Sequence, residues 1–201
     1  MGGMKVFLLY FVFGYIALYL AIWLHEVGHA VMFAKYNCKD NPFDVYVPPY
    51  LFFSTPNPVH QEKVEKLNLK QIFHVGISGI TTNIVFGLPI FILLLWLGFP
   101  NGLGFFFLFS FALFHLVEAA TYLIISNIFL SSDMVLVQQY NPKLRVPLFL
   151  LGMLIVGVIF YMIINATESW RTGLIFAVTI MTMSMGLGRI IFTKLNTAKS
   201  A

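Results

Sequence analysis

Two histidines four residues apart, His25 and His29, have the type and spacing that most directly indicate chemistry in this chain. Side chains at positions i and i+4 of a helix project from one face, so both imidazoles can reach the same zinc ion. Glu26 would lie beside that ion, where it can take a proton from water and pass it to a leaving amine. The spacing predicts a zinc centre with two histidine ligands and a glutamate general base. The alternative is a pair of buried histidines bonded to other helices.

A catalytic zinc ion usually has three protein ligands, so a third ligand must come from elsewhere in the chain. Of the eight acidic residues, only Glu26, Glu118 and Asp133 lie inside or at the edge of an apolar stretch. Asp133 ends the third apolar stretch, on the same side of the membrane as the two histidines in the topology given below. We therefore expect Asp133 to complete the site. Its alternative role is the N-cap of a short helix that continues to Tyr140.

Three more polar side chains lie within apolar stretches, where ionisable groups usually serve a function. His115 and Glu118 form an i, i+3 pair near the middle of the third stretch. They could supply the third metal ligand, orient a liganding histidine from outside the metal site, or form a hydrogen-bonded pair between helices. Asn83, in the second stretch, can donate to an oxyanion or to a substrate backbone carbonyl.

The elements that must position these residues are membrane helices. The chain of 201 residues is 59% hydrophobic and 10% charged, whereas soluble domains carry about a quarter charged residues. A helix needs about 20 apolar residues to cross the hydrocarbon core of a bilayer. We therefore expect an all-α polytopic membrane protein that forms one membrane domain over residues 1–201. Its five expected transmembrane helices cover the stretches 6–34, 71–97, 103–130, 146–164 and 171–192.

The segment between the first two stretches, residues 36–70, is polar and rich in proline. Phe43, Val45 and Val47 alternate with other residues in the period of two that is typical of a strand. Pro48 and Pro49 follow and would stop this strand, as suits the edge of a sheet. We expect a short β segment at the membrane surface that pairs with an extended substrate. Alternatively, the aromatic residues of the segment lie on the bilayer.

Basic residues indicate the orientation of the chain, because cytoplasmic loops of membrane proteins carry an excess of lysine and arginine. Five spans leave only Lys5 and Arg171 on one side. The N-terminus should therefore lie outside, and the C-terminus and the active-site end in the cytoplasm. The net charge of +4 reflects this topology rather than a nucleic-acid partner. The ten basic residues on the cytoplasmic side are Lys35, Lys39, Lys63, Lys66, Lys70, Lys143, Arg145, Arg189, Lys194 and Lys199.

Three motifs resemble those of the site-2 protease family of intramembrane zinc metalloproteases. Residues 25–30, His-Glu-Val-Gly-His-Ala, resemble the family's His-Glu-x-Gly-His-Ala motif in a membrane helix. Residues 79–83, Gly-Ile-Thr-Thr-Asn, resemble its Gly-x-x-x-Asn element in the next helix. Asn127 and Asp133 are similar to a later asparagine-plus-aspartate element. Together these motifs cover a catalytic three-helix core over residues 6–140, and residues 146–193 would be accessory helices.

The resemblance implies an intramembrane zinc endopeptidase that cleaves within or beside transmembrane segments of membrane-protein substrates. One zinc ion per chain would be held by His25, His29 and Asp133, with Glu26 as general base. Asn83 and Asn127 would bind substrate or stabilise the transition state. The chain departs from the family at Asp133, because the usual Asn-Leu-Leu-Pro stretch and the Asp-Gly pair are absent. The distance from Asn127 to Asp133 is also shorter than in typical members.

Two other interpretations remain open. A membrane zinc protease of the HtpX-like or prenyl-protein-processing type also has His-Glu-x-x-His but uses a glutamate as third ligand, which would be Glu118 here. A non-catalytic metal-binding membrane protein would be either a transporter or an inactive relative of the proteases. The outer halves of the apolar stretches carry almost no polar groups, and this disfavours a transporter.

Overall fold

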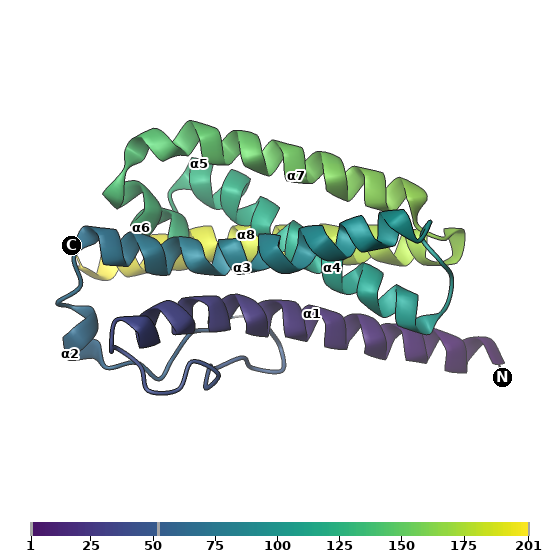
Figure 1. Cartoon of the computed structure of the whole chain (residues 1–201), viewed down its shortest axis with the longest axis horizontal. Coiled ribbons are helices and arrows are strands. Elements are labelled where there is room, and N and C mark those ends of the chain that lie inside the picture. The colour runs from purple at the N-terminus through teal and green to yellow at the C-terminus, as the bar shows by residue number, and fades with distance from the viewer. Residues whose placement is uncertain (1, 52, 201) are drawn as a thin grey trace.

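The computed structural model describes residues 2–51 and 53–200, and its elements are helices joined by short turns and one longer surface segment (Figure 1). The helices, in chain order, are α1 (Gly2–Lys35), α2 (Gln61–Val64), α3 (Leu69–Trp96), α4 (Leu103–Thr121), the π-helix η1 (Tyr122–Ser126), α5 (Asn127–Phe129), α6 (Asp133–Tyr140), the 3-10 helix η2 (Pro142–Leu144), α7 (Arg145–Asn165) and α8 (Glu168–Ser200).

Within the described part of the chain, five helical segments are long and apolar enough to cross a membrane, which confirms the five predicted stretches and indicates a multi-pass membrane protein. Local chemistry explains two of their boundaries. Asn68 and Gln71 form a reciprocal capping box that starts α3. After α1, Asn37 takes a left-handed backbone conformation with φ 58°, which ends the helix. The five segments are Lys5–Lys35, Leu69–Trp96, Leu103–Phe129, Pro142–Asn165 and Glu168–Leu195.

Helix α4 is the central element of the molecule. The long helices run along the long axis in Figure 1, and α4 crosses obliquely between them. Its residues 109–121 are all buried, whereas most residues of the outer spans are partly or fully exposed. Aromatic rings fill the end near the N-terminus, where Phe106 packs edge-on against Tyr10 and Trp170. The polar residues of α4 therefore lie in the interior of the protein and not against lipid.

The third span ends in an irregular turn that reverses the chain. It passes from α4 through the π-helix η1 into α5, and Leu130 then takes a left-handed conformation with φ 50°. The Ser131 amide donates to the Ser126 carbonyl, which closes the turn. Ser132 also has a positive φ of 52°, and Asp133 starts α6 directly after it. The short helix through Tyr140 that belonged to the alternative role of Asp133 is present, but Ser132 and not Asp133 is its N-cap.

The predicted strand at Phe43, Val45 and Val47 does not form within the described residues. The segment after α1 has one isolated antiparallel bridge, in which Tyr46 and Thr55 exchange two backbone hydrogen bonds of 3.0 Å. Pro48 and Pro49 lack the amide hydrogens that would extend this ladder. The alternation of side chains is therefore present without the strand pairing that it normally accompanies.

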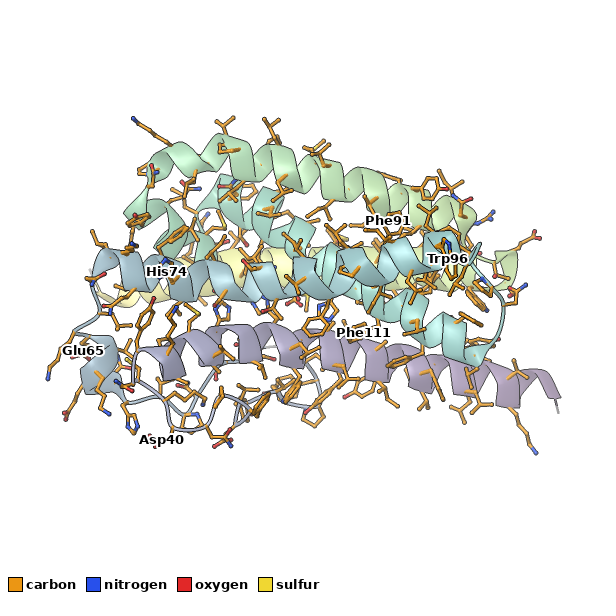
Figure 2. All side chains as sticks on the ribbon, in the orientation of Figure 1. Asp40, Glu65, His74, Phe91, Trp96 and Phe111 are labelled. Atoms are coloured by element: carbon orange, nitrogen blue, oxygen red, sulfur yellow. The ribbon has the colours of Figure 1, made fainter. Side chains whose placement is uncertain are left out.

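The two ends of the molecule differ in charge. The segment between α1 and α3 lies at the end where α1 finishes and where the C-terminus also lies (Figure 1). Asp40, Glu65 and His74 are at or near this end, and Phe91 and Trp96 lie toward the opposite end (Figure 2). The lysines at positions 35, 39, 63, 66 and 70 belong to the first of these ends, in agreement with the predicted asymmetry.

Candidate metal centre

His25, His29 and Asp133 converge on one point between α1 and α6. Their ligand atoms all lie within 4.8 Å of one another, and the three residues form a group that could hold a metal ion. The two Nε2 atoms are 3.1 Å apart. The Asp133 Oδ2 atom is 3.4 Å from His25 Nε2 and 3.1 Å from His29 Nε2. Asp133, the residue expected to complete the site, thus lies beside both histidines.

These distances match the spacing that a tetrahedral zinc site requires. Zinc–nitrogen and zinc–oxygen bonds of about 2.0 Å place neighbouring ligands of a tetrahedron about 3.3 Å apart. The three observed separations lie between 3.1 and 3.4 Å. Moreover, Asp133 Oδ2 is buried, and its near polar neighbours are the Nε2 atoms of the two histidines. A buried carboxylate needs a cation or a hydrogen-bond donor nearby, and two imidazole nitrogens with one carboxylate oxygen are a donor set that fits a zinc ion.

Glycines on α3 allow α1 and the start of α6, the two segments that carry the candidate ligands, to approach so closely. A Cβ atom on Gly79 would lie 2.8 Å from His25 Nε2 and closer still to His29 Nε2. A Cβ atom on Gly76 would lie 3.1 Å from the carbonyl oxygen of Asp133. Both positions therefore need a residue without a side chain. Helix α3 supplies the surface against which the imidazoles and the start of α6 are packed.

A backbone carbonyl orients His29. Its Nδ1 atom lies 2.7 Å from the carbonyl oxygen of Val75, which can only accept a hydrogen bond. His29 Nδ1 therefore donates to this carbonyl, and Nε2 is the ring nitrogen that faces Asp133 and His25. Ligating histidines are commonly held in this way by a partner on the other ring nitrogen.

A side chain orients His25. The Nδ2 atom of Asn83 lies 3.0 Å from His25 Nδ1, and the Oδ1 atom of Asn83 lies 2.8 Å from His115 Nδ1. All three residues are at most 1% exposed. Asn83 thus lies directly behind a candidate ligand, and the predicted outer role of His115 is the one that its position supports.

Glu26 lines a cavity of about 440 Å³, together with Ser132, the residue before Asp133. The carboxylate is on the same helix as both histidines and is 7% exposed. The cavity lies between α1, the end of α4, the surface segment and α8. Its walls include the polar residues Ser54, Thr55, Glu118, Ser132, Ser184 and Arg189. Space for a polar ligand therefore exists beside the candidate general base.

Arg189 of α8 forms a stack with Tyr122 and His25 that the sequence did not predict. Its guanidinium carbon lies 3.5 Å from the centre of the Tyr122 ring. Tyr122 is in turn nearly parallel to the His25 imidazole, at 4.8 Å and 11°. Because two groups cannot overlap on one face of a ring at these distances, Tyr122 lies between the cation and the candidate ligand.

The same arginine pairs with Glu118. Arg189 Nη2 lies 3.3 Å from Glu118 Oε1, and Nη1 donates to Thr121 Oγ1 at 2.7 Å. The group of candidate metal ligands does not include Glu118. Arg189 was counted among the ten basic residues of the cytoplasmic side, but it lies within the fifth span and faces the protein interior. Nine basic residues on one side against two on the other still leave the predicted asymmetry.

Asn127 lies outside the group of candidate ligands. Its amide donates to the carbonyl of Arg145 at 2.8 Å and its oxygen accepts from Gln138, so it joins α5, α6 and the start of α7. His74 bonds to the Tyr36 hydroxyl at 2.5 Å and also lies outside the group.

Arg189 could have been singled out from the sequence, because a charged residue within an apolar stretch usually has a partner there.

Comparisons with family models, with curated proteins and with solved structures found no match to this chain. The geometry of the centre and its surroundings therefore carries the functional argument.

Proposed function

We propose that the chain is an intramembrane zinc endopeptidase that cleaves a peptide bond within or beside transmembrane segments of membrane proteins. The observation that carries this proposal is the convergence of His25, His29 and Asp133 beside a cavity that Glu26 lines. A metal-binding protein without catalysis needs the three ligands only. A carboxylate between the ligands and a cavity is the arrangement that hydrolysis needs.

The candidate ligands and Glu26 have different parts in the proposed hydrolysis. Zinc held by His25, His29 and Asp133 would supply a Lewis acid that polarises a carbonyl group and makes water more acidic. Glu26 takes the proton from the attacking water and delivers it to the leaving nitrogen of the peptide. The burial of these side chains beneath α3 and α4 keeps lipid and bulk water away from the ligands.

The cavity suits an extended backbone. A peptide that unwinds within a membrane exposes N–H and C=O groups that lipid cannot satisfy. Glu118 lines the cavity, and its buried Oε2 atom has no hydrogen-bond partner among the described residues, so this carboxylate is a candidate acceptor for a substrate amide. Ser54 and Thr55 offer hydroxyl groups on the opposite wall.

The resemblance of residues 25–30 and 79–83 to the site-2 protease motifs supports the same function. We assign the N-terminus to the outside and the ligand end to the cytoplasm on the basic-residue count. The ion pair of Glu118 with Arg189 disfavours the HtpX-like arrangement, in which this glutamate would be the third ligand. Zinc content separates the two: we expect Asp133→Ala to lose zinc and Glu118→Ala to keep it.

The proposal is tested with Glu26→Gln, which keeps the size of the side chain and removes the base. Purified protein loaded with zinc is incubated in liposomes with a panel of single-span reporter proteins, and cleavage is followed by gel electrophoresis. We expect Glu26→Gln to bind one zinc ion per chain and to cleave about 10²- to 10⁴-fold more slowly.

Glu62→Gln, in the charged segment before α3, is the matched control and should cleave like the original chain. A zinc chelator should stop cleavage, and added zinc should restore it. Full activity of Glu26→Gln, or cleavage that persists in chelator, would contradict the proposed mechanism. Zinc binding without cleavage of any reporter would favour the non-catalytic interpretation.

A further inference from the structure

The two candidate histidine ligands are oriented by partners of different chemistry. The carbonyl of Val75 leaves His29 one arrangement, with the proton on Nδ1. Asn83, the partner of His25, has both an acceptor and a donor on its side chain. A half-turn about its Cβ–Cγ bond exchanges Oδ1 and Nδ2 within the same volume. The tautomer of His25 therefore depends on which way Asn83 points.

Only one of the two orientations allows His25 to bind a metal ion. With Nδ2 toward His25, as in this structure, Nδ1 accepts and the ring proton is on Nε2, where it blocks coordination. With Oδ1 toward His25, Nδ1 carries the proton and Nε2 has a free lone pair. Asn83 Nδ2 then faces His115 Nδ1, which must accept, so the His115 proton is on Nε2.

The position of His115 determines which of the two Asn83 orientations is favoured. Its ring is fully buried, edge-on to Phe111 at 4.5 Å and stacked on Phe86 at 5.6 Å. Its Nε2 atom has no hydrogen-bond partner among the described residues, so the ring forms its hydrogen bond with Asn83 through Nδ1. Without an acceptor here, one end of the Asn83 amide is left unpaired. Asn83 Nδ2 then has a hydrogen-bond acceptor only when it faces His25 Nδ1, and that orientation blocks the metal.

We propose that Asn83 and His115 are positioning residues for the metal: in the loaded protein His25 Nδ1 donates to Asn83 Oδ1, and Asn83 Nδ2 donates to His115 Nδ1. The inference rests on the metal site of the proposed function and is independent of its proteolytic step. It assigns a role to the buried histidine of α4 that does not require a contact with the metal. Outer partners of this kind typically change metal affinity about 10- to 100-fold.

The test compares variants that separate the shape of His115 from its hydrogen bond. His115→Phe keeps an aromatic ring against Phe86 and Phe111 but removes the acceptor. His115→Asn loses the ring but places an amide oxygen near the position of Nδ1. We expect zinc affinity, measured by competition with a chromophoric chelator, to fall about 10- to 100-fold in His115→Phe and in Asn83→Leu. We expect His115→Asn to stay within about threefold of the original chain, because its oxygen restores the acceptor.

Phe111→Leu is the matched control, because it disturbs the packing around His115 without touching the hydrogen bonds. It should bind zinc as the original chain does. Unchanged zinc affinity in both His115→Phe and Asn83→Leu would overturn the proposal. The proposal would also be overturned if zinc affinity simply followed the thermal stability of the variants, with His115→Phe binding zinc more tightly than His115→Asn.

A second measurement uses the unaltered chain and does not depend on the folding of variants. In the zinc-loaded protein, ¹⁵N resonances of labelled histidines should show His115 protonated on Nε2 and unprotonated on Nδ1. The opposite tautomer in the loaded protein would also overturn the proposal. If affinity and tautomer behave as expected while no reporter is cleaved, the positioning role stands and the endopeptidase function fails.

Discussion

The candidate metal ligands of this chain depend on a residue that has no side chain. His25 and His29 can turn their Nε2 atoms toward Asp133 only because Gly79 of α3 leaves room for both rings. The close approach is a property of the pair of helices and not of the His-Glu-x-x-His motif. The motif supplies the donor atoms, and the neighbouring helix fixes where they point.

Gly79→Ala tests this dependence. The new Cβ atom would lie 2.8 Å from His25 Nε2 and nearer to His29 Nε2, so at least one ring must move. Inserting a methyl group into such packing typically costs about 1–3 kcal/mol. We expect zinc affinity to fall about 10- to 100-fold, since 1.36 kcal/mol corresponds to a factor of ten. Gly157→Ala on α7 is the control, because its Cβ would meet no atom within 4 Å, and it should bind zinc normally.

The sequence was sufficient to predict which three candidate ligands lie together, but not the groups behind them. His25 and His29 follow from their spacing, and Asp133 follows from its depth at the end of an apolar stretch. The pairing of Arg189 with Glu118 could not be predicted from spacing or depth, because five helices can be rotated and packed in many ways that satisfy the same hydropathy pattern. For the same reason, the link from Asn83 to His115 becomes visible only when α3 and α4 lie side by side.

Helix α8 is joined to the centre of the protein by a charged contact. Arg189 and Glu118 pair within the membrane-spanning segments, and their side chains are 13% and 3% exposed. Isolated charges are costly at this depth, so each side chain needs the other. The cation also covers the face of Tyr122 that is turned away from His25. The last span is therefore fixed to α4 at the level of the candidate metal centre.

Arg189→Met should destabilise the protein by about 3–5 kcal/mol, because it leaves the Glu118 carboxylate buried without a cation. Thermal unfolding in detergent measures the effect. The double variant Arg189→Met with Glu118→Leu removes both charges, and we expect it to recover much of the lost stability. A double variant less stable than Arg189→Met would show that the ion pair is not the reason for the loss. Arg171→Met, near the start of α8, is the control with a small effect.

The elements themselves were predictable to different degrees. Hydropathy and length located all five spans, because a helix that crosses lipid needs a long apolar sequence whatever its neighbours are. The strand expected at residues 43–47 did not form, since alternation describes a strand only when a partner can pair along it. The π-helix η1 and the left-handed Leu130 leave no clear mark in the sequence, although they return the chain so that Asp133 faces α1.

The candidate centre joins distant parts of the molecule. His25 and His29 belong to the first span, and Asp133 follows the third span more than one hundred residues later. A metal ion held by both segments would close this large loop and bind the folded protein far more strongly than the unfolded one. Metal binding of this type adds to the stability of the whole fold.

Zinc should therefore raise the thermal stability of the chain in a manner that depends on Asp133. A ligand that binds only the folded form stabilises it by about 2.7 kcal/mol when its free concentration is 100 times its dissociation constant. We expect the unfolding temperature in detergent to rise as zinc is added, and to fall back when a chelator is added.

Asp133→Asn should lose the zinc-dependent shift, because an amide oxygen is a weaker ligand than a carboxylate. Glu26→Gln should retain it, since this residue lies beside the ligands and not among them. A zinc-dependent shift that survives in Asp133→Asn but disappears in Glu118→Gln would instead make Glu118 the third ligand.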